Sequence, residues 1–115
     1  MLFICYPKCT TCIKTKNWLK SNNIDFIERD IKENNPTKDE IIKFHQLSKL
    51  DINKLFNTSG LLYKELNLKE KLKGMTLDEK YDLLASNGML IKRPILVLDD
   101  LVLFSFKEEI YKNIL

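Results

Sequence analysis

The sequence of 115 residues has no long hydrophobic run, because charged residues interrupt its apolar stretches well before the length of a membrane-spanning helix. The segment Met1–Cys5 is apolar, but it has no basic leader, and Pro7 and Lys8 follow too soon for a signal peptide. We therefore expect a cytoplasmic protein that has no membrane partner.

A strong net charge is also lacking, since 19 basic and 16 acidic residues leave a formal net charge of +3. The lysines are spread along the chain and form no basic block, so we expect no direct binding to nucleic acid. Arginine is scarce: Arg29 and Arg93 are the only residues that could hold an oxyanion through paired N–H groups. This scarcity limits how the chain can bind an anion.

Cysteine is limited to three residues, Cys5, Cys9 and Cys12. Three thiols without an export signal do not suit a disulfide framework, because the cytosol keeps thiols reduced. Cysteines in this context are more often catalytic or metal-bound. The function is therefore expected to depend on thiol chemistry or on a metal.

The first part of the chain predicts a strand, a helix and a second strand. The chain length is typical of one domain, which we expect to span residues 1–115. The apolar run Leu2–Tyr6, stopped by a proline, predicts a buried strand. A helix over Thr10–Asn22 and a second strand over Ile24–Asp30 follow.

A helical region is predicted next. Thr37 and Glu40 have the spacing of a capping box, which indicates that a helix starts there and continues through Leu47. From Leu50 to Asn87, apolar residues at helical spacing alternate with capping residues, which is typical of several short helices.

The end of the chain predicts a hairpin and a last helix. Two strand-like runs, Ile95–Leu98 and Leu101–Phe104, are separated by the two-residue turn 99–100. Lys107–Leu115 is expected to form a last helix, because Phe106, Ile110 and Ile114 stand at helical spacing. The order of elements predicts an α/β fold, a thioredoxin-like mixed sheet with an inserted helical region between the second and third strands.

Cys9 and Cys12 form a Cys-x-x-Cys motif where the first strand gives way to the first helix. Unpaired backbone N–H groups and the helix dipole favour negative charge there. Such contexts lower a cysteine pKa from about 8.5 into a range of roughly 3.5 to 7.5. We expect Cys9 to be the attacking thiolate. Cys12 lies on the same turn and is the expected resolving thiol.

A structural reading of these cysteines remains open. A Cys-x-x-Cys can be half of a zinc site, but only Cys5 and His45 remain as soft ligands, so we expect no metal. Cys5 lies in an apolar strand and reads as a core residue. His45 is assigned no role, because a lone histidine is more often on the surface or already hydrogen-bonded. The pair could also be incidental.

Arg93 and Pro94 directly precede the third strand, where a proline is tolerated. The position suggests a cis bond, with the proline backbone facing the cysteine pair and offering hydrogen bonds to a thiol substrate. Arg93 would then hold a thiolate, carboxylate or oxyanion near Cys9. Otherwise the proline only starts the strand and Arg93 is a surface charge. Arg93, Pro94, Thr11 and Lys8 are the expected substrate-binding residues.

Three sequence blocks together carry a family resemblance. They are Tyr6-Pro7-Lys8-Cys9-Thr10-Thr11-Cys12 with Lys16 and Trp18-Leu19; Phe56-Asn57-Thr58-Ser59-Gly60 with Tyr63-Lys64-Glu65-Leu66; and Asn87-Gly88-Met89-Leu90-Ile91-Lys92-Arg93-Pro94. Over essentially its full length the chain resembles the arsenate reductase (ArsC) family, in its Spx-like branch. The resemblance implies a thioredoxin-like fold with a helical insertion and Cys9 as the nucleophile.

The resemblance also implies that arsenate reduction is doubtful here. Reductases of the family surround the nucleophile with three arginines, and this chain keeps only Arg93; Asn57 and Phe106 stand at the other two positions. Lys8, Lys14 and Lys92 could supply charge but not bidentate geometry. The reductases often lack the second cysteine, so the presence of Cys12 favours an internal disulfide.

Two functions of different classes follow. The first is a thiol-disulfide oxidoreductase with no tightly bound cofactor, for which glutathione or another thiol is the electron donor. Its substrate would be a small thiol or a protein disulfide, with glutaredoxin or thioredoxin as candidate partners. The alternative is a redox-sensing regulator like Spx, which binds the RNA polymerase α subunit. The Phe56–Gly60 block resembles the reductase-like members more. A member that keeps the fold with little activity is a third reading.

Overall fold

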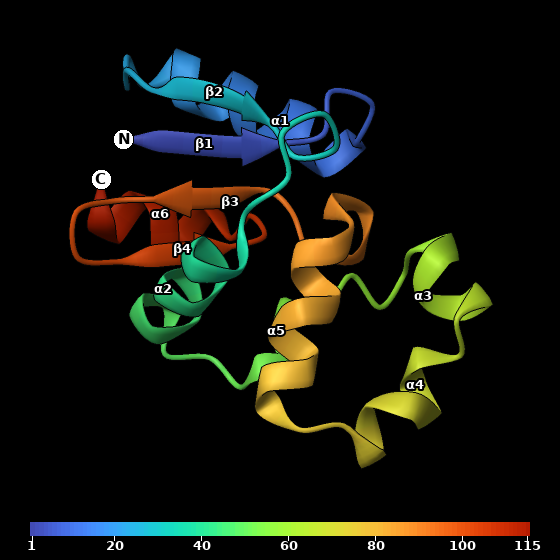
Figure 1. Ribbon diagram of the computed structural model, residues 1–115. Coiled ribbons are helices and arrows are strands. Elements are labelled where there is room, and N and C mark those ends of the chain that lie inside the picture. Colours follow the sequence, from blue (N-terminus) through green and yellow to red (C-terminus); the bar gives the residue numbers. More distant parts are fainter.

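The structure is a computed structural model that describes residues 1–115 (Figure 1). Its strands are β1 (Leu2–Cys5), β2 (Ile27–Asp30), β3 (Ile95–Val97) and β4 (Val102–Phe104). Its α-helices are α1 (Thr10–Ser21), α2 (Lys38–Ser48), α3 (Leu61–Glu65), α4 (Leu68–Lys71), α5 (Leu77–Ser86) and α6 (Glu108–Ile114). Short 3-10 turns are η1 (Ile52–Leu55), η2 (Leu72–Gly74) and η3 (Gly88–Leu90).

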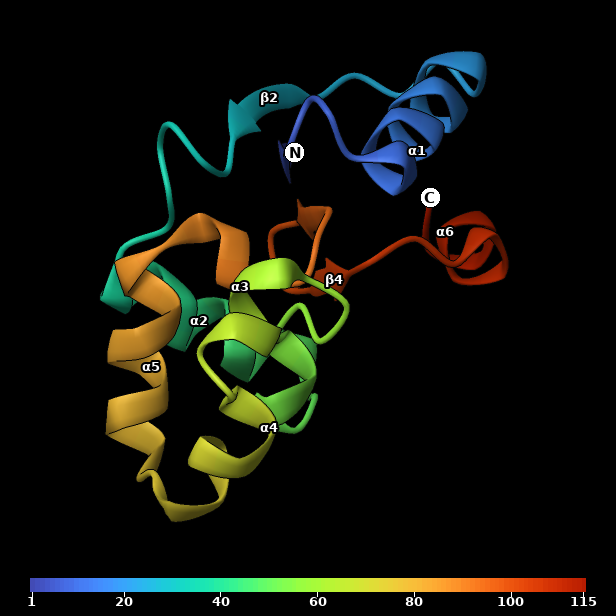
Figure 2. The same cartoon turned by 90° about the vertical axis from the view of Figure 1, so that its right-hand side faces the viewer.

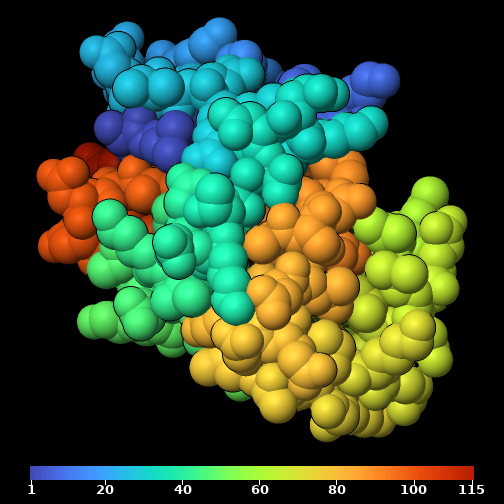
Figure 3. Space-filling model, viewed as in Figure 1, coloured from blue at the N-terminus to red at the C-terminus, as the bar shows by residue number.

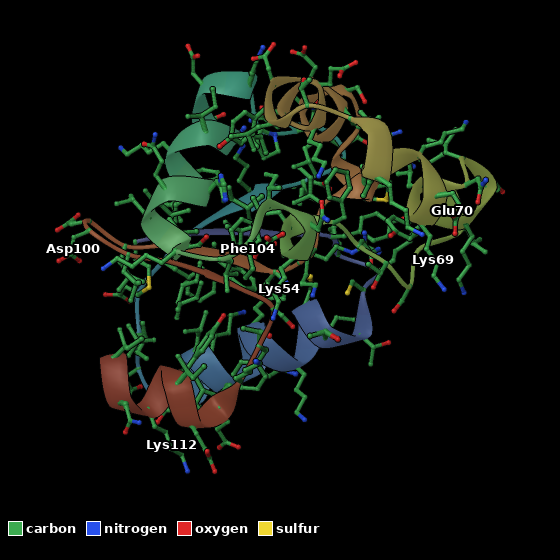
Figure 4. The ribbon with its side chains drawn as sticks, turned by 90° about the horizontal axis from the view of Figure 1, so that it is seen from below. Lys54, Lys69, Glu70, Asp100, Phe104 and Lys112 are labelled. Atoms are coloured by element: carbon green, nitrogen blue, oxygen red, sulfur yellow. The ribbon has the colours of Figure 1, made fainter.

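The four strands form one mixed sheet in the order β2-β1-β3-β4. β1 pairs in parallel with β2, whereas the β1–β3 and β3–β4 pairs are antiparallel. The expected two-residue hairpin is confirmed by a 2.8 Å hydrogen bond from the backbone N–H of Leu98 to the carbonyl of Leu101. Figure 4 marks its tip at Asp100. The predicted fold class is confirmed.

Helices cover both faces of the sheet, as Figure 2 shows. α1 and α6 lie on one face, and α2, α5 and the inserted helices lie on the other. Side chains alternate along β1, so Ile4 enters the large core on the α2–α5 side while Phe3 and Cys5 enter a smaller core on the α1–α6 side. The small core therefore contains Cys5 and Cys12, two of the three thiols.

Capping boxes fix the starts of the two longer helices on the α2–α5 face. The Thr37 hydroxyl accepts from the Glu40 N–H, and the Glu40 carboxylate accepts from the Thr37 N–H, which confirms the predicted box. Thr76 and Glu79 form the same arrangement at the start of α5. These reciprocal bonds satisfy backbone donors that a helix start leaves unpaired.

The second strand begins at Ile27, three residues later than the predicted Ile24. The chain first turns through Asn23, which has a φ of 56°, and the N–H of Ile24 donates to the carbonyl of Leu19 at 3.0 Å. Ile24 packs against the small core instead of joining the sheet. Residues 24–26, which the apolar pattern assigned to the strand, therefore belong to the connection between α1 and β2.

The predicted last helix is present as α6, but the isoleucines that indicated it are not its buried residues. Ile110 and Ile114 are 39% and 40% exposed, whereas Tyr111 is 1% exposed. Tyr111 is held by an aromatic cluster, in which its ring lies 4.8 Å from Phe106 and 5.7 Å from Trp18 between centroids. The aromatic contacts turn the helix so that Tyr111, not the isoleucines, faces the sheet.

The inserted helices project from the body of the molecule on one side. In the space-filling view, the α3–α4 segment forms one wall of a hollow beside the chain that leads into β3 (Figure 3). None of the helices combines the length and the hydrophobicity needed to cross a lipid bilayer.

Candidate functional site

Cys9 is the N-cap residue of α1, at the end of the loop that leaves β1. Its backbone N–H donates to the carbonyl of Tyr6 at 2.9 Å, and its carbonyl accepts from the N–H of Ile13 at 3.0 Å. Its side chain is half-buried and forms no capping bond. The sulfur is therefore held at a helix start, where backbone N–H groups favour an anion.

Cys12 lies one turn further into α1 and is 2% exposed. The backbone N–H of Tyr6 donates to its Sγ at 3.3 Å. Cys12 shares the small core with Cys5, and Cys9 packs against that core. The neighbouring Cys5 thiol and burial raise the pKa of Cys12 well above the ordinary value of a thiol. In the reduced protein Cys12 is therefore a protonated thiol beside Cys9.

The predicted cis bond between Arg93 and Pro94 is confirmed. β3 pairs with β1 so that Ile95 lies opposite Ile4. One step further along this antiparallel register places Pro94 opposite Cys5, and the next step places Arg93 opposite Tyr6. The proline therefore lies beside the strand end that leads to the cysteine motif.

The guanidinium of Arg93 lies over the ring of Tyr6, with 5.2 Å between Cζ and the ring centroid. Its Nε and Nη1 are buried and have no hydrogen-bond partner. Buried donors without partners cost free energy, and a buried cation without a counter-charge costs more. An anionic group of a ligand would accept hydrogen bonds from these donors and would balance the positive charge. Arg93 is thus the residue best suited to bind a carboxylate or an oxyanion.

A pocket of about 530 Å³ opens beside Arg93. It is lined by Asn57, Ser59, Gly60, Leu61, Leu62, Glu65, Met89 and Arg93. The second and third sequence blocks of the resemblance therefore meet at one site. Because Glu65 and Arg93 carry opposite charges, the pocket offers one group for a ligand amine and one for a ligand carboxylate.

Two further predicted residues, Lys8 and Thr11, are exposed next to the thiols. Lys8 forms no ion pair, and the side chain of Thr11 forms no hydrogen bond; only its carbonyl accepts a bond, from Thr15. Their predicted substrate contacts remain predictions. Sequence reasoning missed Tyr6, whose N–H reaches Cys12 and whose ring carries Arg93.

His45 is hydrogen-bonded within the fold, which is one of the two settings that the sequence suggested. Its Nδ1 bonds to the Tyr81 hydroxyl at 2.5 Å, and its Nε2 bonds to the Leu50 carbonyl at 2.9 Å. Cys5 is 3% exposed within the small core. No three side chains of the types His, Cys, Asp and Glu come together in a group that could hold a metal ion.

Solved structures define the class of protein. The chain superposes on a putative ArsC family related protein from Bacteroides fragilis with a TM-score of 0.95 and 48% identity, covering 97% of this chain and 94% of that one. For a possible arsenate reductase from Streptococcus mutans, the TM-score is 0.87 with 41% identity, covering 96% of both chains. The fold is the thioredoxin-like fold of ArsC proteins.

Sequence relatives make the assignment specific. The ArsC family profile matches residues 5–114, and the chain belongs to the ArsC family. It is 47% identical to the uncharacterized protein YusI of Bacillus subtilis over 98% of this chain and 96% of YusI. It is 38% identical to the regulatory protein MgsR of Bacillus subtilis, over 84% of this chain and 75% of MgsR. The global transcriptional regulator Spx 2 of Bacillus cereus is 29% identical, over 88% of this chain and 76% of Spx 2.

Proposed function

We propose that this protein is a thiol-disulfide oxidoreductase that reduces disulfides of small thiol compounds, with glutathione or a similar thiol as its electron donor. The observation that carries the proposal is the place of Tyr6 between the thiols and an arginine: its backbone bonds to Cys9 and to the Cys12 sulfur, and its ring carries Arg93, an arginine with two nitrogens that lack a partner. A nucleophile, a resolving thiol and an anion-binding group are the three parts that this chemistry needs.

The reaction proceeds by two exchanges. The Cys9 thiolate attacks one sulfur of the substrate disulfide, a Cys9–substrate bond forms, and the other half leaves as a thiolate. Cys12 then loses its proton and attacks the Cys9 sulfur, which forms the Cys9–Cys12 disulfide and releases the reduced second half. The substrate gains two electrons and the cysteine pair loses them. Two molecules of a small thiol restore the pair.

The environment of Cys12 sets the order of these steps. Its raised pKa keeps it protonated, so Cys9 reacts first. The Tyr6 N–H at 3.3 Å from its Sγ would stabilise the negative charge that develops when Cys12 attacks. Arg93 and Glu65 would orient a ligand that carries a carboxylate and an amine, as glutathione does.

Arsenate is a poorer candidate substrate. Of the two positions where the resemblance implies further arginines, Asn57 lines the pocket but is uncharged. Phe106 lies in the aromatic cluster with Trp18 and Tyr111, so it offers no charge to an oxyanion. A coupled assay with arsenate, glutathione and glutaredoxin should show no turnover.

The test of the proposal is reduction of oxidised glutathione and of a glutathionylated peptide by the reduced protein. The wild type should exchange rapidly and finish with an internal disulfide. Cys9→Ser should lose exchange, and Cys12→Ser should stop at a mixed disulfide that mass spectrometry detects. If the wild type exchanges no faster than Cys9→Ser, the proposal is wrong.

A regulator that binds RNA polymerase is the second candidate, favoured by the likeness to MgsR and Spx. In that case the cysteine pair would serve as a redox sensor. Retention of the protein on the immobilised C-terminal domain of the polymerase α subunit, dependent on oxidation, would support the regulator. A plain reductase should not be retained.

A further inference from the structure

Cys5 is a third thiol next to the Cys-x-x-Cys motif, and the proposed reaction does not use it. It is the last residue of β1, and it points with Phe3 into the core between the sheet and α1. It is 3% exposed. Cys5 and Cys12 are buried in the same small core and line the same pocket, so Cys5 is a neighbour of the active pair.

Cys12 is the thiol that the other two have in common. It shares the small buried core with Cys5, and it follows Cys9 by three residues in α1, while Cys9 packs against the edge of that core. Thiol-disulfide exchange needs an attacking thiol next to one sulfur of the disulfide. Cys5 meets this condition at Cys12, since the two residues share one core and line one pocket.

We propose that Cys5 is a second resolving thiol, which moves the disulfide from Cys9–Cys12 to Cys5–Cys12. This inference rests on the proposed function, since that reaction supplies the first disulfide. Cys5 loses its proton and its sulfur attacks Cys12 Sγ. The Cys5–Cys12 bond forms, the Cys9–Cys12 bond breaks, and Cys9 leaves as a thiolate. Cys5 is oxidised and Cys9 is reduced, so no further oxidant is needed.

The positions of the three residues favour this direction. Cys9 leaves as an anion at the N-terminal end of α1, where backbone N–H groups stabilise the charge. The new disulfide joins two buried residues and replaces one that includes the half-buried Cys9. Cys9 is then free to attack a second substrate molecule while the first oxidation is stored behind it.

A separate pocket reaches the buried pair. It has a volume of about 270 Å³, and Cys5, Cys12, Tyr6 and Lys16 are among its lining residues. Lys16 is held there by a 2.6 Å ion pair with Glu28 on β2. Cys5 and Cys12 therefore lie at one opening to solvent, through which a small thiol could return the stored disulfide to the reduced state.

The experiment uses the two trypsin sites around the motif, after Lys8 and after Lys14. The full-length protein is oxidised with oxidised glutathione, its free thiols are blocked with N-ethylmaleimide in acid, and it is digested without reductant. A Cys9–Cys12 disulfide remains inside peptide 9–14. A Cys5–Cys12 disulfide joins peptide 1–8 to peptide 9–14, so mass spectrometry separates the two.

We expect the wild type to give both products, with the joined peptides increasing after the internal disulfide has formed. Cys9→Ser keeps only Cys5 and Cys12, and diamide should convert it to the joined peptides. Cys12→Ser keeps only Cys5 and Cys9 and should give none. Because Cys9 is half-buried at a helix start, Cys9→Ser should fold, which circular dichroism checks.

The outcomes separate the two proposals. If the wild type forms the internal disulfide but neither it nor Cys9→Ser gives joined peptides, the role of Cys5 is refuted and the oxidoreductase stands. If the wild type forms no internal disulfide, the proposed function itself fails. Joined peptides from Cys12→Ser would show that Cys5 and Cys9 pair directly, which overturns the arrangement in which Cys12 is the thiol common to both.

Discussion

Replacing Arg93 with methionine should stabilise the protein and remove its anion site at the same time. Methionine has a similar length and can fill the same space, but it carries no charge and no donors. In the wild type, two buried nitrogens of Arg93 have no partner, and the Tyr6 ring is the aromatic contact of the guanidinium. The ligand-free protein thus retains a residue that is unfavourable for its stability.

The size of the effect follows from these contacts. Each buried donor without a partner costs about 1 to 3 kcal/mol, so two cost roughly 2 to 6. The cation–π contact with Tyr6 offsets about 0.5 to 2 kcal/mol of this. Arg93→Met should therefore raise the free energy of unfolding in the absence of ligand by roughly 0 to 5.5 kcal/mol, with a central value of about 3 kcal/mol.

Urea denaturation followed by circular dichroism measures this change. Reduced glutathione, which does not oxidise the reduced protein, should stabilise the wild type by about 2.7 kcal/mol at a concentration of a hundred times Kd, and should not stabilise Arg93→Met. Arg29→Met is the matched control, because Arg29 forms a 2.7 Å ion pair with Glu40 and should lose stability in the same exchange. If Arg93→Met is less stable than the wild type, or gains as much from glutathione, the reasoning about Arg93 is refuted.

Three other predictions concern the scaffold. Arg29 lowers the pKa of Glu40 from 4.5 to about 2, so the stability due to this pair is present above about pH 4.5 and is lost as the pH falls through about 2. With a third of the side chain exposed, Glu40→Gln should cost about 1 to 2 kcal/mol at pH 7, and urea titrations should show the difference shrinking towards pH 2. Gly88→Ala would place a Cβ 1.9 Å from the Ile31 carbonyl oxygen, and should lower stability by about 2 kcal/mol or more in the same assay. Tyr111→Ala should cost about 3 to 5 kcal/mol, because the side chain is buried between α6, α1 and the sheet.

Local sequence signals predicted the features that depend on neighbouring residues. The Thr37–Glu40 capping box, the hairpin turn and the cis bond before Pro94 are each determined by a few consecutive residues. The mixed sheet and the inserted helical region also followed, from the order of the elements and from the resemblance.

Features that depend on distant contacts were missed. The buried side of α6 is fixed by Trp18 on α1, and no spacing within residues 106–115 reports that contact. The sequence also gives no sign that two nitrogens of Arg93 lack a partner, although the carboxylate Glu65 lines the same pocket. The contact between Cys5 and Cys12 arises where the end of β1 packs on α1. A pattern places each residue on an element, but packing decides which side chains meet.

The two pockets divide the proposed chemistry between an oxidising side and a reducing side. A substrate disulfide approaches Cys9, with its charged groups held by Arg93 and Glu65 in the larger pocket. If the disulfide then moves to Cys5–Cys12, the electron donor must reach it through the smaller pocket, whose volume is about 270 Å³. Cys5 and Cys12 are only 3% and 2% exposed, so the inward transfer favours a reductant small enough to enter that pocket, such as glutathione.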